Sequence, residues 1–164
     1  MLKHAYLIVA NGNFNVVKTC LKMIDDARND IYLILDSKAK VSKEIKDQLT
    51  QCVDKSQIEI CEQVVNWAGY SQISAVLNLM EKAIDNSDYQ YLHFMQGSDL
   101  PIRSQDDIHN FFNKNDGKEF VQIEFSRKEM ANRKAWYRHF FCHNRFFRKN
   151  RFVKILNFGL MEVQ

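Results

Sequence analysis

The sequence predicts an α/β fold with a Rossmann-like, mostly parallel β-sheet and flanking helices. Apolar runs of strand length alternate with segments of helical periodicity as far as about residue 112. Each apolar run ends in a polar or glycine-containing turn, as expected for buried strands of a parallel sheet. Strands of this kind are joined by right-handed crossovers. A length of 164 residues is sufficient for one such domain.

A first strand is followed by a helix and a second strand. Residues 5–10 form a continuous apolar run that ends in the turn at residues 11–13. The next segment has apolar residues at helical spacing: Phe14, Val17, Leu21 and Ile24. The polar residues 25–30 close this helix, and residues 31–35 form the second buried strand, with residues 36–38 at its carboxyl end.

A second helix, a short strand and a long third helix come next. The second helix has one apolar face, made by Ile45, Leu49, Cys52 and Val53. It leads to a short third strand at residues 58–60. Residues 65–71 then connect this strand to the clearest apolar stripe of the chain, made by Ile73, Val76, Leu77, Met80, Ala83 and Ile84.

The segment from residue 89 to residue 112 predicts a strand, a turn and a helix. The aromatic run 89–95 stops at Gly97, and Ser104-Gln-Asp-Asp107 has the pattern of a helix N-terminus. Asp99 therefore lies beyond the carboxyl end of a strand, where open α/β sheets place their ligand groups. On geometry alone, Asp99 is equally well explained as a residue that caps the turn.

The C-terminal part of the chain differs in composition. Residues 119–125 alternate in the manner of a half-buried strand. Basic and aromatic residues are mixed from residue 127 onward, without glycine or proline until Gly159, which predicts one or two helices. We therefore predict an α/β domain at residues 1–126 and a basic, aromatic, helical extension at residues 127–164.

The overall composition is ordinary for a soluble protein, at 46% hydrophobic and 26% charged residues. The net charge of +3 is too small to indicate nucleic-acid binding by itself. The four cysteines contain no C-x-x-C pair and are predicted to be reduced structural residues, with a free reactive thiol as the alternative. His139 and His143 share a helical face but lack an acidic third metal ligand, so no metal site is predicted.

The sequence shows no signal peptide and no apolar run near the roughly 20 residues that a membrane helix needs. These observations predict a cytoplasmic protein. Peripheral attachment to a membrane surface remains the alternative, because basic residues gather near the C-terminus.

Three sequence blocks carry a resemblance to a known family. They are Ala5-Tyr-Leu-Ile-Val-Ala10, Val65-Asn-Trp-Ala-Gly-Tyr-Ser71 and Gly97-Ser-Asp-Leu-Pro-Ile-Arg-Ser104. In order and spacing they resemble the core-2/I-branching N-acetylglucosaminyltransferases and peptide xylosyltransferases, glycosyltransferase family 14, from about residue 4 to residue 125. The resemblance implies a GT-A-like nucleotide-sugar-binding half. It also implies inverting transfer of N-acetylglucosamine or xylose from a UDP-sugar to an acceptor hydroxyl.

The resemblance places the donor nucleotide across the carboxyl ends of the first strands. The matching residues are Val9, Ala10 and Asn11, then Asp36 and Ser37, and finally Val65, Asn66 and Trp67. The backbone at Val9 can hydrogen-bond a uracil edge, and Asp36 can accept from an imide or hydroxyl group. Trp67 can form a wall beside the base or ribose. The alternatives are a solvated turn acid for Asp36 and a core aromatic for Trp67.

Further residues match positions on the donor or acceptor side: Asp99, Glu124 and Arg127. The chain contains no Asp-x-Asp motif, with which many glycosyltransferases hold a divalent metal. The resembling family lacks this motif, and in some members basic side chains serve the diphosphate instead. No cofactor or metal is therefore expected beyond the UDP-sugar substrate.

The chain departs from the family pattern in three respects. Ala10-Asn11 replaces a common histidine after the first strand, and Trp67-Ala-Gly69 replaces Trp-Gly-Gly. The family's domain also continues past this length, so the catalytic glutamate base is expected beyond Gln164 and no catalytic residue is assigned. The chain is therefore predicted to be a truncated, donor-binding N-terminal part with poor activity alone.

Two other classes of function remain open. One is a non-catalytic interaction module, and the other is a domain that binds nucleic acid or a membrane surface through its basic C-terminal cluster. The expected partners are a UDP-sugar donor and a glycan or protein hydroxyl acceptor. A missing C-terminal half, a second copy of the chain and a membrane surface are further candidates, while nucleic acid is disfavoured.

Overall fold

The structure is a computed structural model that describes residues 3–66 and 69–120. Several predictions lie outside these residues. They concern Trp67, Glu124, Arg127, residues 121–125 of the predicted strand 119–125, and the extension at 127–164; residues 119 and 120 are described and belong to no strand.

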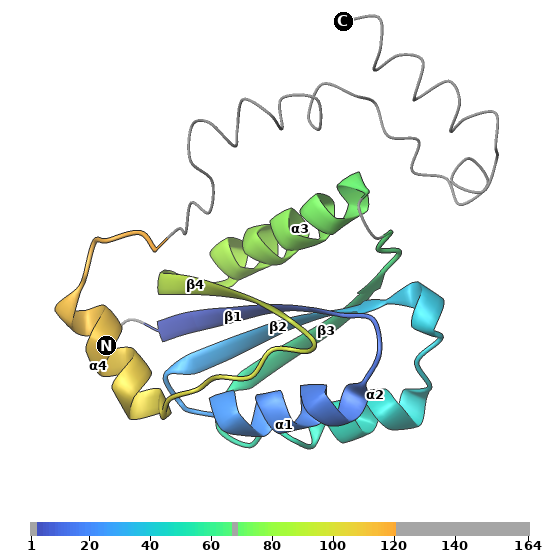
Figure 1. Cartoon of the computed structure of the whole chain (residues 1–164), viewed down its shortest axis with the longest axis horizontal. Helices are drawn as coiled ribbons and strands as arrows, with labels where there is room; N and C mark the ends of the chain where they lie inside the picture. Colours follow the sequence, from blue (N-terminus) through green and yellow to red (C-terminus); the bar gives the residue numbers. More distant parts are fainter. Residues whose placement is uncertain (1–2, 67–68, 121–164) are drawn as a thin grey trace, which may run out of the picture. The chain divides into compact units, whose positions relative to one another are not determined.

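Four parallel strands form one sheet in the order β3-β2-β1-β4 (Figure 1). The strands are β1 (Lys3–Ala10), β2 (Asn29–Asp36), β3 (Gln57–Gln63) and β4 (Tyr89–Gln96). β1 pairs with β2 and with β4, and β2 pairs with β3. The structure thus confirms the predicted α/β class and its Rossmann-like sheet.

Helices cover both faces of the sheet (Figure 1). α1 (Phe14–Ile24) and α2 (Lys43–Thr50) lie on one face, and α3 (Tyr70–Asn86) lies on the other. A short 3-10 helix, η1 (Ser37–Ala39), follows β2, and α4 (Gln105–Lys114) follows β4. The Ser104 hydroxyl accepts from the Asp107 backbone N–H at 3.2 Å, so the predicted N-cap of α4 is confirmed.

The core consists of two apolar layers, one on each face of the sheet. The layer between the sheet and helices α1 and α2 includes Ile8, Leu21 and Leu33. The layer between the sheet and α3 includes Leu7 and Leu79. β2 is buried along its whole length because it has neighbours on both sides and helices on both faces. Burying each such aliphatic side chain contributes about 1.5–3 kcal/mol. None of the helices within the described ranges has the length and apolar character needed to cross a membrane.

β2 begins two residues earlier than the sequence predicts. The sequence pattern places Asn29 and Asp30 in a polar loop, yet both are buried in the strand. Each has hydrogen-bond partners that compensate for burial: Asn29 Nδ2 donates to the Ile24 carbonyl at 2.8 Å, and Asp30 accepts from Lys3 Nζ at 2.9 Å. The polar pattern of this segment therefore reflects tertiary pairing.

The buried face of α3 differs from the predicted apolar stripe. Its fully buried residues are Ala75, Leu79 and Ala83, of which two are alanines that allow close approach to the strands. Three residues of the predicted stripe are exposed instead: Ile73, Leu77 and Ile84. We call these three the apolar flank of α3.

Hydrogen bonds to β3 orient α3 on the sheet. Ser74 and Asn78 both bond the side chain of Gln63, at 3.0 and 2.8 Å. Lys82 forms an ion pair with Glu59. The polar side of α3 is thereby held over β3.

Gly97 allows the chain after β4 to lie against the end of β1. Its N–H donates to the Val9 carbonyl at 2.9 Å. A Cβ at this position would lie 2.6 Å from Ala10 Cβ and 2.9 Å from Ala10 Cα. Contacts this short do not occur between real carbon atoms, so the position requires glycine.

Three histidines join β1, β4 and α4 at the amino end of the sheet. His4 Nδ1 lies 3.0 Å from His93 Nε2, and the ring of His4 stacks on His109 at 4.1 Å between centroids. His109 Nε2 lies 2.9 Å from Asn29 Oδ1. Phe112 packs edge-on against both His4 and His93. This histidine cluster (His4, His93 and His109) connects α4 to the sheet.

Burial keeps the histidine cluster neutral. It lowers the pKa of His4 to about 4, with further contributions from the neighbouring His109 and His93 and a smaller one from Arg28. Burial, with the neighbouring His109, also lowers the pKa of His93 to about 4. The pKa of His109 is lowered in the same direction, first by burial and then by Arg28. Acid must therefore protonate groups that the folded state holds uncharged.

Gly97→Ala is expected to destabilise the fold by about 1–3 kcal/mol, because the new methyl group overlaps Ala10. Urea unfolding measures the change. The double variant Gly97→Ala/Ala10→Gly removes the nearest of the clashing atoms and should recover part of the loss. Equal stability of Gly97→Ala and wild type would show that the two segments are not in contact.

The free energy of unfolding is expected to fall as the pH drops from 6.5 toward 4. The unfolded histidines bind protons near pH 6.5, whereas His4 and His93 in the folded state bind them near pH 4. Two hydrogen-bonded imidazoles do not titrate independently, so we expect a loss on the order of 3 kcal/mol for the pair.

Urea unfolding at a series of pH values between 7 and 5 tests this dependence, because most carboxylates remain ionised there. His93→Gln retains a hydrogen-bonding side chain but cannot titrate, so its stability should decline less steeply. A wild-type stability that stays constant over this range would contradict the role of the cluster.

Candidate functional site

A pocket of about 280 Å³ opens at the carboxyl edge of the sheet. Its walls come from the segments that follow β1, β2, β3 and β4 and from the first turn of α3. The lining residues are Val9, Asn11, Gly12, Asn13, Asp36, Lys38, Val65, Gln72, Phe94, Gln96, Gly97 and Ser98. This is the edge at which open parallel sheets bind ligands.

The wall that follows β1 leads into the N-terminus of α1. Asn13 is the N-cap residue and has left-handed backbone geometry, with φ 51°. Its side chain makes no capping hydrogen bond, and the first turn of α1 contains no acidic residue. The positive end of the α1 dipole therefore lies at the wall of the pocket without a neutralising carboxylate in that turn.

Asp36 ends β2 and is 5% exposed. Its Oδ1 accepts from the backbone N–H of Lys38 at 3.1 Å and from that of Val65 at 3.2 Å. Its Oδ2 lies 3.3 Å from Lys38 Nζ. This carboxylate therefore connects the segment after β2 to the segment after β3.

Lys38 extends the same connection. Besides the ion pair with Asp36, its Nζ donates to the Val65 carbonyl and to Asn66 Oδ1, the latter at 3.2 Å. Asn66 is held from the other side, because its N–H donates to the Ser71 hydroxyl at 2.7 Å. Residues 65 and 66 are thus fixed between η1 and the start of α3.

The wall that follows β4 is a tight turn held by Asp99. The Gln96 N–H donates to Asp99 Oδ2 at 2.8 Å, and the Asp99 N–H donates to the Gln96 carbonyl at 2.9 Å. Asp99 is not among the lining residues of the pocket. Of the roles that the sequence left open for Asp99, the structure supports the fixing of the turn.

The structure brings half of the predicted donor-site residues into one pocket. The four that line it are Val9, Asn11, Asp36 and Val65. Three others lie beside it: Ala10 is buried beneath Gly97, Ser37 begins η1, and Asn66 contacts Lys38. Trp67, Glu124 and Arg127 are outside the described residues.

Sequence reasoning did not find the lining residues Lys38, Gln72 and Phe94. Lys38 follows Asp36, at the end of β2, by two residues, and this spacing was the sequence signal that could have placed Lys38 at the pocket. Gln72 lies in the first turn of α3, which follows the Val65 block. Phe94 is part of the aromatic run of β4, and only the strand order shows that its face adjoins Val9 and the pocket.

The lining offers hydrogen-bond acceptors and donors beside an apolar surface. The acceptors include the Asp36 carboxylate, the donors include backbone N–H groups near the start of α1, and Phe94 contributes an aromatic wall. Within residues 3–66 and 69–120, no three His, Cys, Asp or Glu residues are grouped to hold a metal ion. The arrangement suits recognition of a small polar molecule with a flat ring.

A search of curated proteins found no match. The family model described as Core-2/I-Branching enzyme matches residues 4–150, which confirms the resemblance inferred from the three sequence blocks. The chain therefore belongs to the Core-2/I-branching enzyme family, a family of glycosyltransferases that act on a nucleotide-sugar donor and an acceptor.

Proposed function

We propose that the pocket binds the uridine nucleotide of a UDP-sugar, in an inverting transfer of N-acetylglucosamine or xylose to an acceptor hydroxyl. The observation that carries this proposal is the convergence of Val9, Asn11, Asp36 and Val65. These residues follow or end three different strands, and the family resemblance assigns all four to the donor nucleotide. Family membership over residues 4–150 supports the same reaction class.

The size of the pocket favours the nucleoside part of the donor. About 280 Å³ is just below the usual range for small-molecule sites, which suits a uridine better than a complete nucleotide-sugar. The N-terminus of α1 adjoins the pocket, and backbone N–H groups at such a position favour negative charge. The diphosphate of the bound nucleotide would therefore extend out of the pocket next to the N-terminus of α1.

Each proposed contact follows from the chemistry of the lining. Asp36 accepts a hydrogen bond from a uracil imide or a ribose hydroxyl. The Val9 carbonyl already accepts from Gly97 and retains a second lone pair for the base edge. Phe94 provides apolar contact for a ring. The role of Trp67 beside the base or ribose remains a prediction.

The transfer itself requires two further functions. A general base must take the proton of the acceptor hydroxyl as its oxygen attacks the anomeric carbon, and the departing UDP must be stabilised. We assign no residue to the base. In the absence of an Asp-x-Asp motif anywhere in the sequence, we propose that nucleotide binding needs no divalent metal.

A second candidate function, a protein interaction module, is favoured by β4, an outer strand of the sheet. Among the described strands, β3 and β4 are the two outer ones. β3 carries Glu59 and Glu62, charges of the kind that protect an edge, whereas β4 has no charged residue. Phe94 of β4 is 51% exposed and lies on the face that α3 covers, and the apolar flank of α3 is also exposed. Such a surface is typical of an interface.

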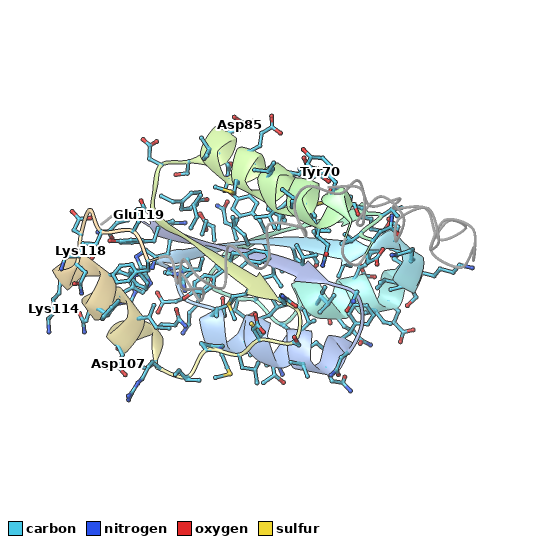
Figure 2. The ribbon with its side chains drawn as sticks, turned by 45° about the horizontal axis from the view of Figure 1, so that its top comes forward. Tyr70, Asp85, Asp107, Lys114, Lys118 and Glu119 are labelled. Carbon is cyan, nitrogen blue, oxygen red and sulfur yellow. The ribbon has the colours of Figure 1, made fainter. Side chains whose placement is uncertain are left out.

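Isothermal titration calorimetry is expected to show binding of UDP but not of ADP, with the same affinity in EDTA. Asp36→Asn should weaken UDP binding by about 10- to 100-fold, because it removes a charge-assisted hydrogen bond. Asp85→Asn is the matched control, since Asp85 is exposed near the end of α3 that lies away from Tyr70 and the pocket (Figure 2). Equal UDP affinity in Asp36→Asn and wild type would contradict the assignment of the site.

The interaction alternative makes a different prediction. If the β4 edge is an interface between copies, sedimentation velocity will show association that grows with protein concentration. Leu77→Glu should abolish it, because a charge is then placed on the apolar flank of α3. Ile102→Glu, at a residue 93% exposed in the loop after β4, is the control. A monomeric wild type at all concentrations would contradict self-association.

A further inference from the structure

Lys38 lines the pocket, yet its ammonium group contacts oxygen atoms of the protein. Its Nζ lies 3.3 Å from Asp36 Oδ2 and 3.2 Å from Asn66 Oδ1, and it also donates to the Val65 carbonyl. An ammonium group has three N–H donors. Each donor of Lys38 therefore has an oxygen atom of the protein as its neighbour, which leaves none for a ligand.

The carboxylate of Asp36 has more acceptor positions than partners within the described ranges. Asp36 Oδ1 accepts two backbone hydrogen bonds, from Lys38 and Val65. Oδ2 faces one partner among the described residues, the Nζ of Lys38. A carboxylate oxygen has two acceptor positions. Oδ2 therefore retains one acceptor position, and Oδ1 retains none.

The ion pair also alters the charge that a ligand meets. Asp36 is 7% exposed at its side chain, and an unpaired carboxylate there would repel the negative diphosphate of a nucleotide. Pairing with Lys38 cancels this charge but leaves the acceptor position of Oδ2 intact. The Lys38 side chain is 49% exposed, so the ion pair joins a buried carboxylate to a half-exposed ammonium group.

We propose that Lys38 is a positioning residue that holds Asp36 Oδ2 toward the pocket, and so selects ligands with an N–H or O–H donor at that point. This inference rests on the proposed function, because it concerns the same pocket. Lys38 acts through Asp36 and through the segment at Val65 and Asn66, without touching the ligand. Two groups of a uridine nucleotide have the required chemistry, the imide N–H of the base and a ribose hydroxyl.

Competing ligands distinguish these two sources. If Oδ2 accepts from the base, CDP should bind more weakly than UDP, because the ring nitrogen of cytosine at this position is an acceptor. If Oδ2 accepts from the ribose, CDP and UDP should bind alike and 2′-deoxy-UDP should bind more weakly. Two ratios of dissociation constants are therefore measured in the wild type, CDP to UDP and 2′-deoxy-UDP to UDP. The ratio that differs from one is called the discrimination ratio and is attributed to Asp36.

The test is calorimetric titration of the full chain and its variants with UDP, CDP and 2′-deoxy-UDP. Lys38→Met should weaken UDP binding by about tenfold and bring the discrimination ratio close to one, since Asp36 loses its fixed orientation. Lys38→Arg keeps a cation beside Asp36 and should restore most of the discrimination. Lys43→Met is the matched control, because Lys43 is exposed in the first turn of α2.

The outcomes separate this inference from the proposed function. A wild type that binds no uridine nucleotide overturns the proposed function and this inference with it. A wild type that binds UDP, with unchanged affinity and discrimination in Lys38→Met, overturns the role of Lys38 alone. A melting temperature measured for every variant shows whether a loss of binding reflects a loss of fold. A folded Lys38→Met that binds UDP weakly and without discrimination supports the inference.

Discussion

The parallel pairing of β1 with β2 is the constraint on which the rest of the structure depends. Both strands have neighbours on both sides and helices on both faces, so their central residues must be apolar. Charged side chains of these two strands then lie only where the strands begin or end. Because the strands are parallel, all of their carboxyl ends meet at one edge of the sheet, and all of their amino ends meet at the other.

The two edges use their polar residues differently. At the amino edge, Asn29 and the histidine cluster bond one another, and α4 covers them. At the carboxyl edge, Asp36 and Lys38 fix the neighbouring segments, but a pocket remains open between them and the end of β4. The residues of the first edge are bonded within the fold, and the second edge contains the pocket of the candidate site. This division explains why the candidate site is found at the carboxyl edge.

The sequence was sufficient to predict the class of the fold, which depends on local patterns, and the family resemblance indicated four residues that line the pocket. Strand ends are visible as apolar runs followed by polar turns, and Asp36 stands directly at such a boundary. Burial of Asn29 could not be predicted, since its partners Gln105 and His109 lie more than 70 residues away in sequence. The role of Lys38 depends on contacts with Val65 and Asn66, which only the folded structure brings near.

The central claim is that the pocket at the carboxyl edge binds the donor nucleotide. Mapping of amide chemical shifts by nuclear magnetic resonance during a UDP titration tests it most directly. The account predicts that the signals of Gly12, Val65 and Gly97 move with a common dissociation constant, while those of Asn29 and Asp30 at the opposite edge stay fixed. Shifts confined to residues away from the pocket, or no shifts at millimolar UDP, would contradict it.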